Sequence, residues 1–128
     1  MSRITRWDDA CEQLRTRFEV ASRGVERADV TVVHRSGEVH TVALRAHVHD
    51  NVSWLEISTK IELPPQAVPT AMLATNANLA IGGLAIDAEG MLRVRHNILL
   101  EGSRVDDLED AVAAIVQIRC QLQRGGRG

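Results

Sequence analysis

The best candidate for a metal site in the sequence is the run His47-Val48-His49-Asp50. Residues two apart on a strand share a face, so the imidazoles of His47 and His49 could bind one ion together. Asp50 or His34 would supply a third ligand. Exposed histidines at a hairpin tip are the commoner explanation, because nothing in the sequence forces a third ligand to lie beside them. A small metal-dependent enzyme that uses His47, His49 and Asp50 is thus only the alternative to the main functional prediction.

A cysteine nucleophile is the second chemistry to consider, because Cys11 and Cys120 could each pair with one of five histidines. Both cysteines fall in helical patterns and lack the glycine-rich turn that usually exposes a nucleophile. Cys11 lies on an apolar helix stripe, which favours a small buried hydrophobic residue over a reactive thiol. The sequence therefore predicts a chain that is not an enzyme and that binds no cofactor.

Another group of side chains is better suited to binding a protein than to catalysis. Tryptophan is costly to expose and, like arginine, is enriched at protein interfaces. In the hairpins described below, one face of the sheet would carry Trp54 together with Arg45, His47, Arg93 and Arg95. These five residues form a candidate partner surface. The simpler interpretation is that Trp54 packs across its hairpin on His47 and the Arg45 stem, and the sequence leaves both open.

Composition narrows the classes of partner. The 128 residues are 45% hydrophobic and 25% charged, which predicts one globular domain over 1–128. The net charge of -2 and the 2% aromatic content argue against a nucleic-acid partner, which needs basic patches and stacking rings. No apolar run approaches a membrane span and no signal-like segment is present, so we expect a cytoplasmic protein without a membrane partner. Lys60 is the only lysine among 15 basic residues, which suggests a GC-rich bacterial genome.

The residues of the candidate surface are positioned by a predicted three-stranded meander at about 29–34, 38–49 and 52–63. Asp50-Asn51 is a two-residue turn, since both residue types tolerate a left-handed backbone. This turn sets a register in which one face is mostly apolar and the other mixed polar, and a slip of one residue would destroy that segregation. The predicted cross-strand pairs are His49–Val52, His47–Trp54, Arg45–Glu56, Ala43–Ser58 and Thr41–Lys60.

The first hairpin of the meander allows two registers. A two-residue turn at Ser36-Gly37 would place Val30 and Val32 on the outer face. A three-residue loop over 35–37, with Gly37 left-handed, places both valines on the apolar face instead. We predict the longer loop, because burial of the valines should determine the register.

The remaining elements complete an α-β-β-β-α-β-β-α order. Apolar side chains recur every three or four residues over 4–25, which predicts an amphipathic helix. We therefore expect an α+β fold in which the helices cover one face of an antiparallel sheet. The other predicted elements are a short helix at about 68–78, a hairpin with strands near 84–86 and 92–100, a helix from Ser103, and a frayed tail over 124–128.

Four stretches around the second hairpin share a strand–turn–strand punctuation: Asn76–Leu79, Gly83–Asp87, Glu89–His96 and Leu99–Gly102. They resemble the YbjN-type family of bacterial sensory-transduction regulators, which are similar in fold to class I type III secretion chaperones. A departure is Leu84, where many relatives carry an aromatic residue. The resemblance implies a dimeric, non-enzymatic module, chaperone-like or regulatory, that binds a protein or peptide client. It would place the homodimer contacts on the second helix, at Met72, Leu73 and Asn76.

Overall fold

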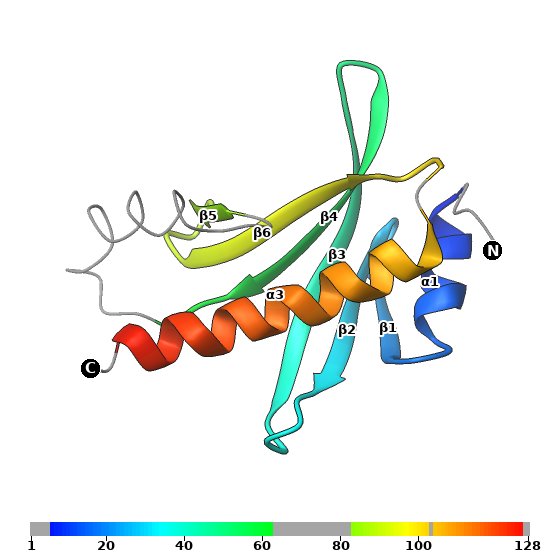
Figure 1. Cartoon of the computed structure of the whole chain (residues 1–128). Coiled ribbons are helices and arrows are strands. Elements are labelled where there is room, and N and C mark those ends of the chain that lie inside the picture. Colours follow the sequence, from blue (N-terminus) through cyan, green and yellow to red (C-terminus); the bar gives the residue numbers. More distant parts are fainter. Residues whose placement is uncertain (1–5, 63–82, 103, 127–128) are drawn as a thin grey trace.

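The structure is a computed structural model that describes residues 6–62, 83–102 and 104–126. Within these ranges the chain forms two helices and six strands, labelled as in Figure 1. The helices are α1 (Trp7–Leu14) and α3 (Val105–Gly126). The strands are β1 (Glu19–Gly24), β2 (Arg27–Val33), β3 (Val39–His49), β4 (Val52–Lys60), β5 (Gly83–Ile86) and β6 (Leu92–Leu99).

The strands form one antiparallel sheet in the order β1-β2-β3-β4-β6-β5. Helix α3 crosses one face of the sheet, with α1 beside its N-terminal end, and the tip of the β3–β4 hairpin projects beyond the other strands (Figure 1). The fold is thus α+β with its described helices on one face, as predicted. No helix in the described ranges combines the length and hydrophobicity needed to cross a membrane.

The core lies between α3 and the face of the sheet that it covers. Alternate residues of each strand point to this face, because successive side chains of a strand project to opposite sides. Complete removal of such a side chain from water stabilises the fold by about 1.5–3 kcal/mol. The fully buried members include Val30, Val42, Leu55, Ile57 and Val94 from the sheet and Leu108, Val112 and Ile115 from α3.

The β3–β4 hairpin has the predicted turn and register. Asp50 and Asn51 have φ values of 52° and 62°, the left-handed conformation expected of a tight hairpin turn. The observed pairs run from His49–Val52 through His47–Trp54 and Arg45–Glu56 to Ala43–Ser58.

The β2–β3 hairpin has the predicted three-residue loop. The His34 amide donates to the Glu38 carbonyl across the loop, and Gly37 has a φ of 90°. Val30 and Val32 are both buried on the covered face. Burial of these valines therefore agrees with the longer loop.

The first predicted helix, over 4–25, is wrong in its second half. Helix α1 ends at Leu14, and residues 19–24 form β1 at the edge of the sheet, paired with β2. Phe18 and Val20 pack against the core with a period of two, whereas Val25 is 92% exposed. The helical stripe and the strand alternation share only Phe18 here, and pairing with β2 satisfies the backbone of this segment.

The other boundaries differ by a few residues. Strand β4 ends at Lys60, before the predicted 63, although the Ile61 amide still donates to the Leu92 carbonyl. Helix α3 continues through Gly126, three residues into the segment assigned to a frayed tail. The predicted helix over 68–78 and the residue Ser103 lie outside the described residues.

Candidate functional site

The five residues of the candidate partner surface lie on the face of the sheet opposite α3, which we call the open face. His47 pairs with Trp54 across the β3–β4 hairpin, and Arg45 lies two residues before His47 on the same side of β3. Arg95 pairs with Ser58 and Arg93 with Lys60. Trp54 is half-buried rather than fully exposed. The fold therefore brings these side chains, predicted from two separate hairpins, to one face.

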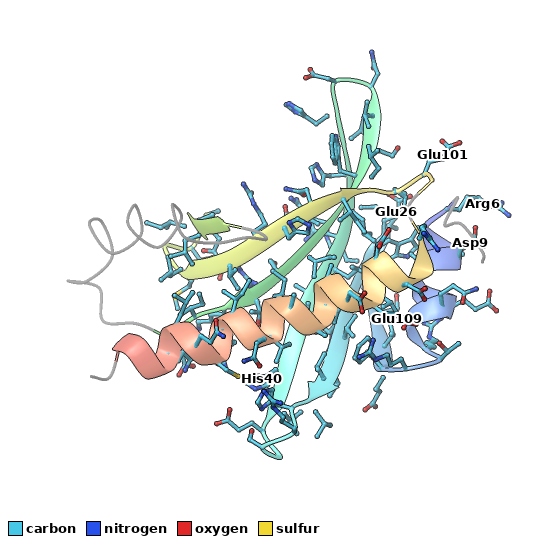
Figure 2. All side chains as sticks on the ribbon, viewed as in Figure 1. Arg6, Asp9, Glu26, His40, Glu101 and Glu109 are labelled. Atoms are coloured by element: carbon cyan, nitrogen blue, oxygen red, sulfur yellow. The ribbon has the colours of Figure 1, made fainter. Side chains whose placement is uncertain are left out.

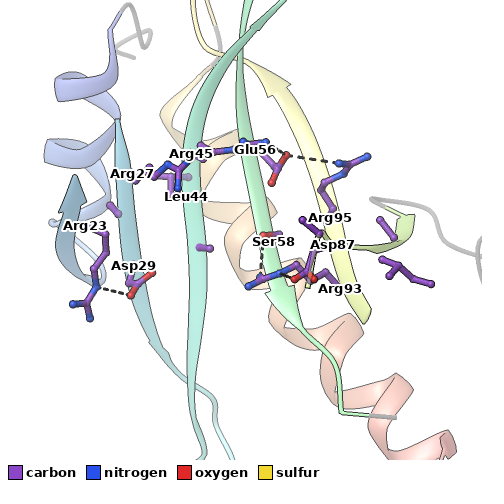
Figure 3. A pocket seen from close by; sticks show the side chains of 15 residues that line it. Arg23, Arg27, Asp29, Leu44, Arg45, Glu56, Ser58, Asp87, Arg93 and Arg95 are labelled. Atoms are coloured by element: carbon purple, nitrogen blue, oxygen red, sulfur yellow. Dashed lines mark hydrogen bonds and ion pairs between the residues drawn. The ribbon is translucent and has the colours of Figure 1, made fainter. Parts of the chain in front are cut away.

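A network of ion pairs crosses the open face. Oε2 of Glu56 lies 2.9 Å from a guanidinium nitrogen of Arg45 and 3.8 Å from one of Arg95 (Figure 3). On β6, Nε of Arg93 lies 3.0 Å from Oδ2 of Asp87. The carboxylate of Glu56 thus ties β3, β4 and β6 together, while Arg45 and Arg95 compete for the same oxygen.

The Asp87 carboxylate closes the loop between β5 and β6. Its Oδ1 accepts hydrogen bonds from the amides of Met91 and Glu89, and its Oδ2 accepts one from Arg93. The Met91 amide, followed by the Arg93 guanidinium, lowers the pKa of Asp87 below its usual value. This carboxylate therefore stays charged and bound within the chain.

A shallow hollow of about 610 Å³ lies among these residues. Ala43 and Ser58, adjacent on β3 and β4, form part of its lining, and charged side chains surround them (Figure 3). On the β1–β2 side, Arg23 lies 2.7 Å from Asp29. Sequence reasoning missed Arg23 and Arg27, because it placed 19–25 in a helix and began the next strand only at residue 29.

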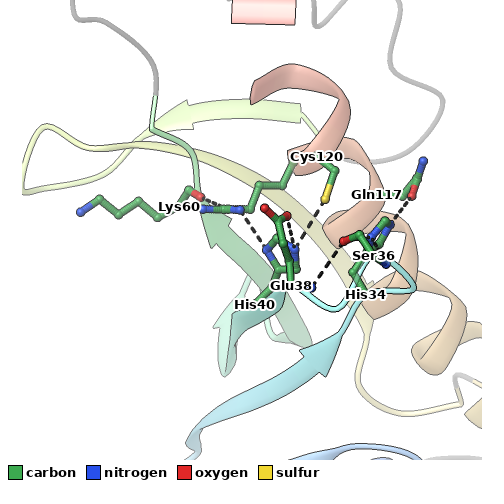
Figure 4. Close-up of polar contacts among 8 residues, drawn as sticks. His34, Ser36, Glu38, His40, Lys60, Gln117 and Cys120 are labelled. Carbon is green, nitrogen blue, oxygen red and sulfur yellow. Dashed lines mark hydrogen bonds and ion pairs between the residues drawn. The ribbon is translucent and has the colours of Figure 1, made fainter. Parts of the chain in front are cut away.

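A second cluster surrounds His40 on the covered face, at the end of the sheet that carries the β2–β3 hairpin (Figure 2). His40 is 5% exposed. Its Nδ1 lies 2.9 Å from a guanidinium nitrogen of Arg119, and its Nε2 lies 3.6 Å from Sγ of Cys120 and 3.4 Å from Glu38 (Figure 4). Potential ligand atoms of Glu38, His40 and Cys120 lie within 4.8 Å of one another.

The hydrogen bonds of His40 oppose a metal at this cluster. A guanidinium only donates, so the Nδ1 of His40 accepts and its Nε2 carries the proton. The Nε2 atom that faces Cys120 and Glu38 therefore has no lone pair for a metal unless Arg119 leaves. Metal-binding histidines instead donate their second ring N–H to an acceptor.

The same geometry differs from that of a cysteine nucleophile. In a catalytic triad the nucleophile and the acidic residue contact opposite nitrogens of the histidine, whereas Cys120 and Glu38 both face Nε2. Burial, followed by the charge of Arg119, lowers the pKa of His40, so the ring is neutral at pH 7. This arrangement satisfies the polar atoms of the buried histidine and offers no activated thiol.

The alternative metal site at the β3–β4 tip is more dispersed than its sequence suggests. The Nε2 of His47 lies 3.0 Å from Oδ1 of Asn97, and His49 instead contacts its neighbour Asp50 at 3.4 Å. Both His49 and Asp50 are exposed. In the ranges 6–62, 83–102 and 104–126, converging metal-ligand atoms occur at Glu38, His40 and Cys120, not at this tip.

The remaining predicted site residues fall outside or away from these clusters. Met72, Leu73 and Asn76, the predicted dimer contacts, lie outside the described residues. Cys11 is buried in the core, and burial raises the pKa of its thiol, which agrees with the predicted hydrophobic role.

Comparison with known proteins identifies the fold. No family model matches the chain, and no curated protein sequence matches it. In the solved structure of the HopA1–SchA chaperone–effector complex, one chain is 18% identical to this one. The match covers 92% of this chain and 90% of that chain, with a TM-score of 0.58. The predicted chaperone-like α+β fold is therefore confirmed, whereas membership of the YbjN-type family stays a prediction.

Proposed function

We propose that this chain is a cytoplasmic, non-enzymatic module, chaperone-like or regulatory, that works as a homodimer on a protein or peptide client. The observation that carries the proposal is the fold similarity to a chain of a chaperone–effector complex over 92% of this chain. Shared fold is an argument by analogy, so the proposal also needs support from the surface of this chain itself.

That support comes from the contrast between the two polar clusters. The His40 cluster is buried, and its ring nitrogens both have partners. The open face instead presents Arg45, Arg95 and a half-buried Trp54 on the six-stranded sheet. Arginine and tryptophan on a rigid scaffold are the residue types that anchor protein interfaces. We therefore propose the open face as the client surface, with Met72, Leu73 and Asn76 in the dimer contact.

The first experiment measures the mass of the purified chain by light scattering on a size-exclusion column, with elemental analysis of the same peak. We expect a metal-free species near twice 14.1 kDa. A monomer that carries one equivalent of metal would contradict the proposal and favour the alternative enzyme at His47, His49 and Asp50.

The second experiment tests the client directly. A tagged chain is cross-linked in its source cells, the captured protein is identified, and the complex is rebuilt from the two purified proteins. We expect a stoichiometric complex in which the client stays in solution under conditions where it precipitates alone. A rebuilt mixture in which client precipitation is unchanged would overturn the chaperone role.

A further inference from the structure

We propose that the hollow of the open face binds an acidic segment of the client, whose carboxylates pair with Arg27 and Arg95. This inference rests on the proposed function, because it names the chemistry of the segment that the module would recognise. Binding would thus depend on arginines of the open face, and not on a metal held by histidines or on a cysteine nucleophile.

The lining of the hollow is positively charged. Five arginines and three carboxylates line it, so its lining carries a net charge of +2, whereas the whole chain carries -2. A positive surface on a negative protein attracts acidic segments and orients them toward this face. The lining charges are Arg23, Arg27, Arg45, Arg93 and Arg95 against Asp29, Glu56 and Asp87.

These arginines differ in how closely a carboxylate of the chain approaches them. Arg23 and Arg93 each have a carboxylate within 3.0 Å, and Arg45 lies 2.9 Å from Glu56. Arg95 reaches the same Glu56 oxygen only at 3.8 Å, and its side chain is 49% exposed. Arg27 is exposed and has no ion pair within the described part of the chain. Arg27 and Arg95 therefore keep donors for an external carboxylate.

The surface between Arg27 and Arg95 includes two short side chains. Ala43 and Ser58 lie side by side on β3 and β4, and Ser58 is 3% exposed. The Arg93 guanidinium lies 3.3 Å from Oγ of the buried Ser58 (Figure 3). The half-buried Ala43 has a short side chain, so a bound segment can approach the sheet closely over Ala43, beside the longer arginines. A carboxylate held there would form charge-assisted hydrogen bonds with guanidinium groups, which are stronger than neutral ones.

The surface favours an acidic protein segment over a nucleic acid. Asp29, Glu56 and Asp87 alternate with the arginines and would repel a continuous row of phosphates. A peptide can space its carboxylates to avoid them. Nucleic-acid strands also need stacking rings, and the chain contains only Trp7, Phe18 and Trp54 as aromatic residues.

The test uses the full chain and a fluorescein-labelled peptide in which glutamate alternates with serine and alanine. A second peptide carries glutamine in place of each glutamate. Fluorescence anisotropy should show that the glutamate peptide binds about tenfold more tightly or better, and that this advantage is lost between roughly 0.1 M and 1 M NaCl. Equal affinities for the two peptides, or no binding of the glutamate peptide, would overturn the inference.

Two double variants with the same net charge locate the site. Arg27→Ala with Arg95→Ala should weaken glutamate-peptide binding by about tenfold. Arg15→Ala with Arg35→Ala removes two exposed arginines that do not line the hollow, and should change the affinity by less than about twofold. An equal loss in both double variants would show a nonspecific charge effect and refute the site. Tighter binding of single-stranded DNA than of the glutamate peptide would also refute it.

The same variants separate this inference from the proposed function. If the captured client binds the wild type and the Arg27→Ala/Arg95→Ala variant equally, the acidic-segment site is wrong and the protein-binding function stands. If the client binds the wild type and is lost only in that variant, both are supported. A wild-type chain that binds the glutamate peptide but forms no complex with the captured protein would count against that protein as the client and leave the site intact.

Discussion

Leu55 and Ile57 of β4 are fully buried on the face covered by α3. Trp54 and Glu56, which alternate with them along the strand, are half-buried on the open face. The same strand thus supplies the core and the candidate surface, because its side chains alternate. The covered face gains stability from apolar burial, and the open face carries charges that are only partly paired. This contrast indicates that substitutions on the two faces should have separable effects.

The histidines of β3 show the same contrast on a smaller scale. His40 points to the covered face, where Arg119, Cys120 and Glu38 surround its ring. His47 points to the open face and has Asn97 as its partner. Burial requires that a polar group be paired, so His40 serves the fold, while His47 stays accessible to a ligand.

The largest expected effect comes from the covered face. Ile57→Ala should lower the free energy of unfolding by about 3 kcal/mol, because it removes apolar contacts and leaves a cavity at a fully buried position. Urea denaturation followed by circular dichroism measures this loss. A loss below about 1 kcal/mol would contradict the placement of Ile57 at the centre of the core.

A smaller effect should come from the loop that sets the register of the covered face. Gly37 has a φ of +90°, and a Cβ at this position would meet no atom within 4 Å. Gly37→Ala should therefore cost about 1 kcal/mol of unfolding free energy through backbone strain alone. Gly37→Asn is the matched control, since asparagine tolerates a left-handed backbone better, and it should cost less in the same denaturation experiment. Equal costs would point to a lost contact rather than strain.

On the open face, Glu56→Gln should cost at most about 1 kcal/mol, although it removes the negative charge that faces both Arg45 and Arg95. Partly exposed ion pairs are screened by salt, so the difference from the wild type should shrink in about 1 M NaCl. Denaturation at low and high salt measures it. A cost similar to that of Ile57→Ala would erase the proposed distinction between the faces.

The most selective prediction concerns acid. Burial and Arg119 lower the pKa of His40 from its ordinary 6.5, so the unfolded chain takes up a proton more readily than the folded one. Stability should therefore fall as the pH drops below 6.5 toward the lower folded pKa. His40→Gln removes this contribution and should flatten the pH dependence of unfolding, even if it lowers stability at pH 7.

The control for that experiment is Ser53→Ala, an exposed substitution on β4 that removes no titratable group and should leave the slope unchanged. His96, whose pKa burial also lowers, remains in both variants and supplies a common residual slope. Parallel pH profiles for the wild type and His40→Gln would show that His40 does not titrate differently in the two states.

Local patterns predicted much of the sheet. Asp50-Asn51 and Gly37 are residues suited to left-handed turns, and burial of the apolar residues selected one register on either side of each turn. The face shared by Arg45, His47 and Trp54 followed directly. Residues 19–24 were mispredicted, because Phe18, Ala21 and Val25 continue the spacing of a helical stripe, whereas the strand buries Phe18 and Val20 instead.

The sequence by itself determined which side chains share a face, since turn chemistry and a period of two act over a few residues. Only the tertiary structure decided that β1 completes the sheet and places Arg23 beside Asp29. It also decided that Arg119, 79 residues after His40, contacts Nδ1 of that ring. This contact leaves the proton on Nε2, which disfavours metal binding there. Such contacts depend on where α3 lies across the sheet, and that position is set by the packing of the whole core rather than by any local pattern.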